Sequence, residues 1–277
     1  MSLGACAPGD STMEKLINLG RILFAIPMIA FGIQYVGLGR YAGGLPPVPP
    51  WAPGEAWGAY LVGAILIATG LSIAINKKAR LSALVIGALF LLCVIFLQFL
   101  YFSSVLHNGV DRTRAFEPLA LSGAAFALAA LLPIEGLGAW AASSSNDDKL
   151  ILLGRLLFGI SMIIFGVQHF MYAPFLATLV MAWLPAHAFW IYFTGASMVA
   201  AGLAITTTVQ ARLAGTMLGV MFLLWVVLLH APRVFAQIHN QDELTSLFVA
   251  LAFSGSSFIF AGAGPRGARK MDRITVA

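Results

Sequence analysis

The fold is decided by the stretch LINLGRILFAIPMIAFGIQY (residues 16–35), which returns as LILLGRLLFGISMIIFGVQH (residues 150–169), an offset of 134 (169 − 35). After one loop of different length the match resumes at an offset of 132 (183 − 51) and continues without a gap. A fixed period this long indicates duplication of a whole helical bundle. Matched pairs lie in loops, turns and apolar runs alike: Trp51/Trp183, Pro53/Pro185, Tyr60/Tyr192, Arg80/Arg212, His107/His239, Asn108/Asn240, Phe116/Phe248 and Ser122/Ser254.

The composition is that of a protein dissolved in lipid. The chain is 60% hydrophobic and 10% charged, with a mean hydropathy of +0.91. Uncharged runs of about 18–25 residues can cross a bilayer as helices, and no alternating pattern suggests strands. The sequence predicts eight spans, near residues 16–38, 57–76, 80–104, 116–134, 150–172, 188–206, 211–230 and 244–262.

Four spans in each repeat have a topological consequence. Both copies must enter the membrane from the same side, which makes them parallel repeats related by an axis along the membrane normal. We therefore expect an all-α membrane protein whose eight transmembrane helices form two parallel-repeat four-helix bundles. The expected divisions are an N-terminal lead (1–15), a first repeat (16–134), a linker (135–149), a second repeat (150–262) and a basic tail (263–277).

Basic residues divide unequally between the two sets of helix ends. Twelve fall at one set, including the tail, and four (Arg40, Arg112, Arg114 and Arg233) at the other. The excess of positive charge predicts that both termini are cytoplasmic. The net charge of +5 then reflects basic loops that lie against anionic lipid, and it requires no nucleic-acid partner.

Candidate ligand-binding residues gather near the predicted outer face. Gln34 and Gln168 are equivalent in the two repeats. Each is followed by a residue whose side chain is a polar ring, Tyr35 in the first repeat and His169 in the second. Gln98 and His230 are also equivalent, near the outer ends of the third helices. One interpretation places Gln168, His169 and His230 in a pocket of the second bundle, with Gln34, Tyr35 and Gln98 as counterparts in the first. The alternative is that these side chains only join neighbouring helices by hydrogen bonds.

Other polar residues fit simpler roles. Arg21 and Arg155, at the cytoplasmic ends of the first helices, are expected to anchor the protein at lipid headgroups or to contact a quinone headgroup. Asn108 and Asn240 are expected to cap the fourth helices or close a turn. A haem held by His169 and His230 would need both rings to face one cavity, which spacing does not indicate. No metal-ligand motif or CxxC pair is present, so no cofactor is indicated directly.

Several of these segments resemble a known family. A span that opens with LGR and ends in FGxQ, a Pro/Trp loop, a second helix striped with glycine, LLHAPR (228–233) and RAFEPLALSGAAFALA (114–129) are similar to the DoxX-like bacterial membrane proteins. The chain resembles a tandem DoxX-like protein. The resemblance implies a bacterial cytoplasmic membrane and a link to quinone chemistry or redox-associated complexes, and it assigns no catalytic residue.

Two classes of function follow. The first is a quinone-linked redox accessory subunit with a small-molecule pocket near the outer face, acting in a membrane redox complex. The second is a non-catalytic scaffold or lipid-carrying protein of a larger complex. We expect a chain that is not an enzyme on its own, and the sequence does not identify the oligomeric state.

Overall fold

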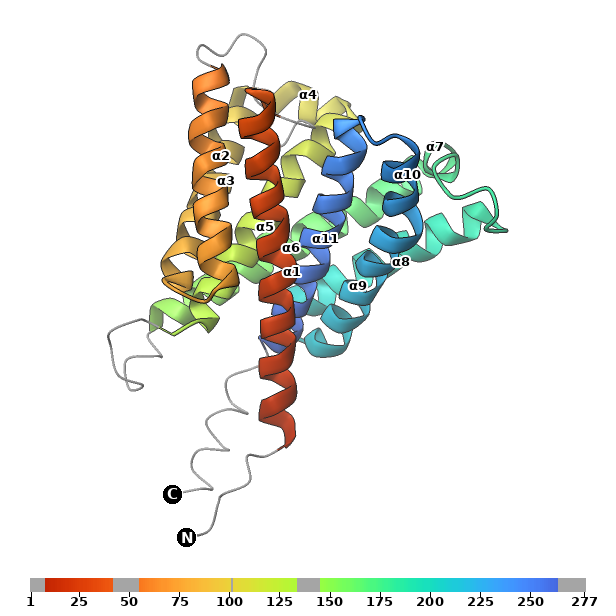
Figure 1. Cartoon of the computed structure of the whole chain (residues 1–277). Coiled ribbons are helices and arrows are strands. Elements are labelled where there is room, and N and C mark those ends of the chain that lie inside the picture. The colour runs from red at the N-terminus through yellow and green to blue at the C-terminus, as the bar shows by residue number, and fades with distance from the viewer. Residues whose placement is uncertain (1–7, 42–54, 101, 134–144, 264–277) are drawn as a thin grey trace.

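The computed structural model describes residues 8–41, 55–100, 102–133 and 145–263, and all the regular structure in these ranges is helical (Figure 1). The elements are α1 (Pro8–Leu38), α2 (Glu55–Ala74), α3 (Ala79–Leu100), α4 (Phe102–His107), α5 (Gly109–Leu131), α6 (Ser145–Met171), α7 (Ala173–Ala177), α8 (His187–Thr207), α9 (Ala211–Trp225), the π-helical turn η2 (Val226–His230), α10 (Ala231–Ala236) and α11 (Gln241–Gly262).

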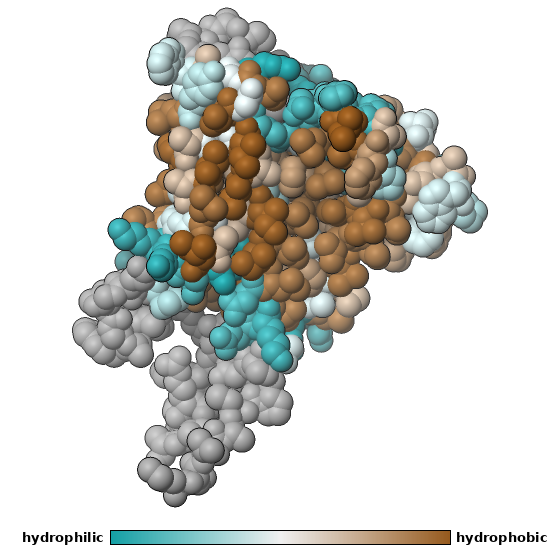
Figure 2. All heavy atoms as spheres, viewed as in Figure 1, coloured by the Kyte–Doolittle hydropathy of each residue, from teal (hydrophilic) through white to brown (hydrophobic). Residues whose placement is uncertain are grey.

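Eight helices of the described ranges are long and apolar enough to cross a membrane, which confirms an all-α membrane protein. They are α1, α2, α3, α5, α6, α8, the continuous unit α9–η2–α10, and α11. Figure 2 shows hydrophobic side chains in a broad band over the middle of the molecule, with hydrophilic residues above and below it. Exposed Ile33, Leu61 and Phe96 belong to this apolar surface, which fits contact with lipid tails.

The helices pair across the two halves of the chain. Besides its neighbour α2, α1 packs most extensively against α11, the last helix of the second half. In the same way α6 packs against α8 and against α5, the last helix of the first half. The expectation of two separate four-helix bundles is therefore not confirmed, because the first helix of each half packs both on the second helix of its own half and on the last helix of the other half. Figure 1 shows α1 and α11 running side by side.

The contacts between the two halves, α1 with α11 and α5 with α6, are made through glycine. A Cβ added at Gly255 of α11 would lie 2.5 Å from Phe24 N and 2.8 Å from Gly20 O of α1. A Cβ added at Gly123 of α5 would lie 2.7 Å from Gly154 O of α6. Only glycine permits backbones to approach this closely in lipid, where close packing replaces the hydrophobic effect as the force between helices.

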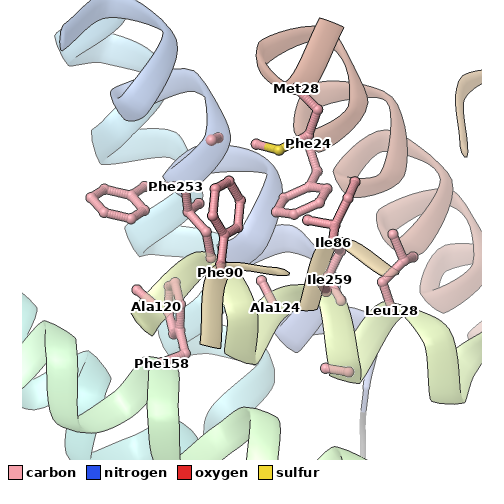
Figure 3. Close-up of a cluster of buried hydrophobic side chains, with 14 of the residues drawn as sticks. Phe24, Met28, Ile86, Phe90, Ala120, Ala124, Leu128, Phe158, Phe253 and Ile259 are labelled. Carbon is pink, nitrogen blue, oxygen red and sulfur yellow. The ribbon is translucent and has the colours of Figure 1, made fainter. Parts of the chain in front are cut away.

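The core lies along α5 and α11, which contact each other. In these two helices 72% of the spanning residues are buried, against 22–44% in the other six. Figure 3 shows the core cluster, in which Phe24 and Met28 of α1 meet side chains of α3, α5, α6 and α11. Small residues such as Ala120 and Ala124 leave room there for the phenylalanine rings.

Residues 132 apart in the two halves make matching contacts. The hydroxyl of Ser122 donates to Gly87 O at 2.8 Å, and that of Ser254 donates to Gly219 O at the same distance. The turn between α2 and α3 has positive φ at Asn76 and Lys78, as the turn between α8 and α9 has at Thr208 and Gln210. The two halves thus share this hydrogen bond and this turn conformation at equivalent positions.

Three helices begin earlier than the spans expected from the sequence. The helix α1 begins at Pro8, inside the expected lead of residues 1–15, and α6 begins at Ser145, inside the expected linker of residues 135–149. In the first turn of α6 the fully buried Asp147 forms an ion pair with Arg80 at 2.5 Å, and an acid there also suits the helix dipole. The helix α5 begins at Gly109 rather than at residue 116, because Asn108 caps it. The tail 264–277 lies outside the described residues.

Candidate functional site

A cavity of about 440 Å³ opens between α5, α6, α7, η2 and α11. It lies at the end of the molecule where α1 and α6 finish and α5 and α11 start, which we call the distal end (top of Figure 1). This volume is in the range of small-molecule sites. The lining is Asn108, Gly109, Val110, Thr113, Glu117, Phe165, Gln168, His169, Tyr172, Phe175, Leu176, Met198, Phe222, Trp225, His230, Ser246, Val249, Ala250 and Phe253.

Three sequence-predicted residues, Gln168, His169 and His230, come together in this cavity. Two of them lie in the last turns of α6, and the third comes from η2, more than 60 residues later in the chain. Their assembly depends on the packing of α11, which contacts both η2 and α5 around the cavity. The ligand-binding role assigned to them stays a prediction, whereas their location at one cavity is a property of the fold.

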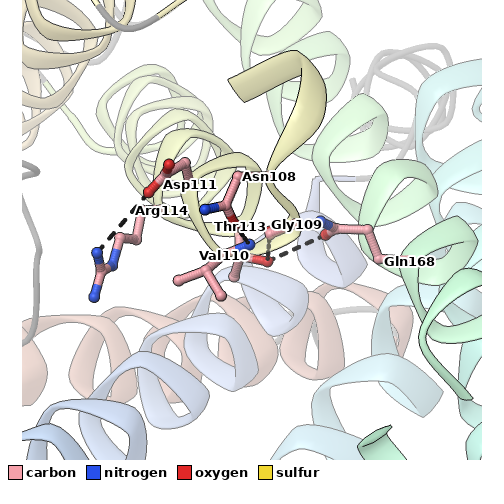
Figure 4. A network of polar contacts seen from close by, with 7 residues as sticks. All are labelled: Asn108, Gly109, Val110, Asp111, Thr113, Arg114 and Gln168. Carbon is pink, nitrogen blue, oxygen red and sulfur yellow. Dashed lines mark hydrogen bonds and ion pairs between the residues drawn. The ribbon is translucent and has the colours of Figure 1, made fainter. Parts of the chain in front are cut away.

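Gln168 is tied to the start of α5 (Figure 4). Its amide nitrogen donates to Gly109 O at 3.0 Å, and its amide oxygen lies 3.2 Å from the hydroxyl of Thr113. The same end of α5 is capped by Asn108, whose side chain accepts from Val110 N at 2.9 Å. Both functional groups of the Gln168 amide are therefore engaged within the protein. Its role in this state is to hold α6 against α5 at the cavity wall.

His169 presents a defined tautomer to the cavity. Its Nδ1 lies 2.8 Å from Phe165 O, one turn earlier in α6. A carbonyl can only accept a hydrogen bond, so Nδ1 carries the hydrogen, and Nε2 of the neutral ring is left as an acceptor. The ring stacks on Trp225 with centroids 5.9 Å apart. This packing and the backbone bond together fix the direction of Nε2.

His230 lies at a local distortion of its helix. In η2 the helix widens, and Ala231 N donates to Val226 O, five residues earlier. The cause is Pro232, which lacks an N–H and whose ring crowds the preceding turn. Such π-helical turns are frequent at functional sites. The Nδ1 atom of His230 is buried, and among the described residues it has no hydrogen-bond partner.

Glu117 and the aromatic lining were not predicted from the sequence as parts of the site. Glu117 is in the third turn of α5, and within the described residues no hydrogen bond or ion pair reaches its carboxylate. The rings of Phe222, Trp225 and Phe253 pack edge-on or tilted around the same space. The error in the α5 boundary hid Glu117, since it placed this acid at a helix end. A carboxylate inside an apolar helix is itself a signal of function.

The first-half counterparts do not line this cavity. Gln34 donates weakly to Gln241 and Thr245 of α11, at 3.3 and 3.4 Å. Tyr35 is 1% exposed, and its ring packs edge-on against Tyr41 with centroids 5.4 Å apart. The side chain of Gln98 lies outside the described residues. The structure therefore does not bring the first-half set to the same site.

Arg21 and Arg155 each bind the end of a helix. The guanidinium of Arg21 donates to the carbonyls of Ile73 and of Ala74, the latter at 2.9 Å, where α2 ends. That of Arg155 donates to Ala263 O, just after α11. A cation there satisfies free carbonyls and suits the helix dipole. These contacts hold helices together at the end opposite the cavity, and the expected headgroup contact stays a prediction.

The remaining polar expectations divide. Asn108 and Asn240 cap α5 and α11, as expected for Asn at these positions. His107, His187 and His239 do not line the cavity. Among the described residues, no group of three or more His, Cys, Asp and Glu side chains could hold a metal ion.

Arg233 fixes the outer wall of the cavity. It lies in α10 and donates to Leu179 O at 2.6 Å, in the segment after α7. Because α7 contributes Phe175 and Leu176 to the lining, this bond holds that wall against η2.

No protein-family model, no curated protein and no solved structure matches the chain.

Proposed function

We propose that this membrane protein binds a quinone or quinol in the distal cavity, as an accessory subunit of a quinone-linked membrane redox complex. The observation that carries the proposal is the meeting of His169 and His230, from two distant helices, at one cavity lined by aromatic rings. A small apolar ring with polar substituents matches a site with a few polar groups in a mostly apolar wall.

The chemistry of the lining supports this ligand class. Phe222, Trp225 and Phe253 offer ring faces and edges to a flat headgroup. His169 Nε2 and the imidazole of His230 offer hydrogen bonds that the protein itself does not use. Unpaired polar groups in apolar surroundings are costly, so a ligand that pairs with them gains affinity.

The wider assignment rests on the sequence. We propose that the chain is a tandem DoxX-like protein of a bacterial cytoplasmic membrane, with parallel repeats and both termini in the cytoplasm. The support is the repeat itself, the twelve-to-four division of basic residues, and the start of α1 beside the end of α11. An added Cβ at Gly262 would lie 3.0 Å from Met13 O. An axis normal to the membrane predicts that α1 superposes on α6 and α5 on α11.

A second function is favoured by the apolar character of most of the lining. A cavity walled by Phe165, Met198 and Val249 could hold a lipid chain, and the protein would then carry lipid or organise a complex without redox chemistry. The two functions differ in the molecule that remains bound after purification.

The test is purification of the full chain in mild detergent, followed by solvent extraction and mass spectrometry of bound molecules. We expect a quinone from the wild-type protein and its loss from the double variant His169→Phe, His230→Phe, at unchanged yield of folded protein. The control is Val167→Phe, on the exposed side of α6 two residues from His169. Lipid alone in every sample, or quinone retained by the double variant, would contradict the proposal.

A further inference from the structure

The free hydrogen-bonding groups of the cavity are unequal in kind. The donor of the Gln168 amide is spent on Gly109 O, and the hydrogen of His169 Nδ1 is spent on Phe165 O. His169 Nε2 therefore offers only a lone pair in the neutral ring. In Gln168 and His169 the donors are thus already used within the protein, whereas His169 Nε2 remains as an acceptor.

Glu117 adds the strongest acceptor. Its carboxylate lines the cavity from α5. The neighbouring Arg114 is half exposed and lies 4.0 Å from Asp111, one turn earlier in the helix (Figure 4). Within the described residues no donor forms a hydrogen bond to Glu117. A hydroxyl donor from a ligand stabilises the ionised carboxylate, which in apolar surroundings otherwise takes up a proton.

Donors are not entirely lacking. Trp225 keeps its indole N–H and Tyr172 its hydroxyl, and both side chains are partly exposed. The imidazole of His230 also carries an N–H, and its Nδ1 has no partner within the described residues. An oxidised quinone could accept from Trp225, but its carbonyls only accept, so they would leave Glu117 and His169 Nε2 unsatisfied. A ring that carries hydroxyl groups satisfies these acceptors, and its oxygen can still accept from Trp225.

We propose that the cavity selects the hydroxyl-bearing, reduced form of its ligand, and that Glu117 accepts the hydrogen bond that makes the selection. The proposal rests on the proposed function, because it names which form of the quinone couple the same site takes. It makes Glu117 a binding residue for that form, with His169 Nε2 as the acceptor for a second ring hydroxyl.

The experiment measures equilibrium binding of decylubiquinol and decylubiquinone to the purified full chain in lipid nanodiscs under anaerobic conditions. We expect the quinol to bind at least about tenfold more tightly than the quinone, since one hydrogen bond to a charged group supports such a factor. Glu117→Gln should weaken quinol binding about tenfold and leave quinone binding within about twofold. Glu117→Asp, which keeps the carboxylate, should retain part of the preference.

The matched control is Glu14→Gln, which removes an exposed carboxylate near the start of α1, at the opposite end of the molecule. It should change neither affinity, and the thermal unfolding of every variant should match that of the wild type. Equal affinity for the two forms, with no effect of Glu117→Gln, would overturn this inference and leave the proposed function standing. Binding of neither form would overturn the proposed function itself.

A third probe separates hydroxyl recognition from charge recognition. An acid among aromatic rings is also a setting for an organic cation. If tetraphenylphosphonium bound more tightly than decylubiquinol and Glu117→Gln abolished its binding, Glu117 would be a counter-charge for cations, and the inference would be wrong.

Discussion

At the distal end the two halves of the molecule share the same glutamine–threonine contact between helices, but the residues packed beside it differ. Gln34 of α1 reaches Thr245 of α11, and Gln168 of α6 reaches Thr113 of α5, so each glutamine holds the first helix of one half against the last helix of the other. The residue after the glutamine differs. Tyr35 is a buried ring, whereas His169 lines a cavity.

The two halves also differ at two further pairs of equivalent residues. At an offset of 132, Cys93 stands where the second half has Trp225, and Val249 of α11 corresponds to Glu117 of α5. Both members of the second pair line the one cavity, because α5 and α11 meet in the centre of the molecule. Matching contacts in the two halves thus surround one cavity that takes its acid from the first half and its imidazoles from the second.

The largest effects are expected at the contacts between the halves, and they test whether the contact of α1 with α11 is equivalent to that of α5 with α6. Gly255→Val and Gly123→Val should each cost about 3 kcal/mol of stability, because the new side chain meets backbone atoms that cannot move aside. Unfolding in a detergent titration, followed by tryptophan fluorescence, measures the change. Gly37→Val is the control, since nothing lies within 4 Å of an added Cβ there. Loss of stability in only one variant would break the equivalence.

The next prediction sharpens the contrast between filled and open positions. Tyr35→Ala should cost about 3 kcal/mol, because it leaves a void where a buried ring packed on Tyr41. His169→Ala should cost about 1 kcal/mol, the price of one backbone hydrogen bond and one stacking contact. The same unfolding measurement applies to both. Equal costs would mean that His169, too, is chiefly a packing residue.

A third pair of variants tests the shared frame. Gln168→Leu should cost about 1.5 kcal/mol and Gln34→Leu about 0.5 kcal/mol, since the contacts of Gln34 are longer and its amide oxygen has no partner. Double-mutant cycles with Thr113→Val and Thr245→Val measure the two couplings directly. A larger coupling for Gln34 would reverse the order proposed here.

The smallest difference is expected at the caps of the last helices. Asn108→Ala and Asn240→Ala should each cost about 1 kcal/mol, because each removes a side-chain acceptor from a helix N-terminus. The two values should agree within about 0.5 kcal/mol. Asn76→Ala is a useful comparison, since its positive φ makes it a turn position rather than a cap. Unequal cap effects would show that one end is held mainly by tertiary contacts.

The eight spans could be predicted from the sequence because uncharged apolar runs of about 20 residues are typical of helices that cross a lipid bilayer. It misplaced the start of α5 because Asp111, Arg112 and Arg114 lie inside that helix, where polar composition resembles a loop. The contacts of α1 with α11 and of α6 with α5 could not be predicted from the sequence. Gly20 and Gly255 are both visible as small residues, but their meeting depends on three-dimensional packing across more than 230 residues.

The candidate site was predictable in part. The repeat singled out His169 because it follows Gln168, which recurs as Gln34, and His230 because it is equivalent to Gln98. The fold brings both histidines to one cavity. Glu117 has no charged counterpart in the other half, so comparison of the repeats gave it no weight. The use of the Gln168 amide within the protein depends on the position of Gly109 O, which only the fold determines.

The pairing of α1 with α11 also imposes an order on synthesis. Gln34 and its partner Gln241 are 207 residues apart, and a ribosome needs roughly 10–40 s to add that length of chain. Throughout that time Gly20 of α1 and the amide of Gln34 contact lipid or another protein in place of α11. Of its two native neighbours, α1 therefore meets α2 early in synthesis and α11 only when the last described helix has been made.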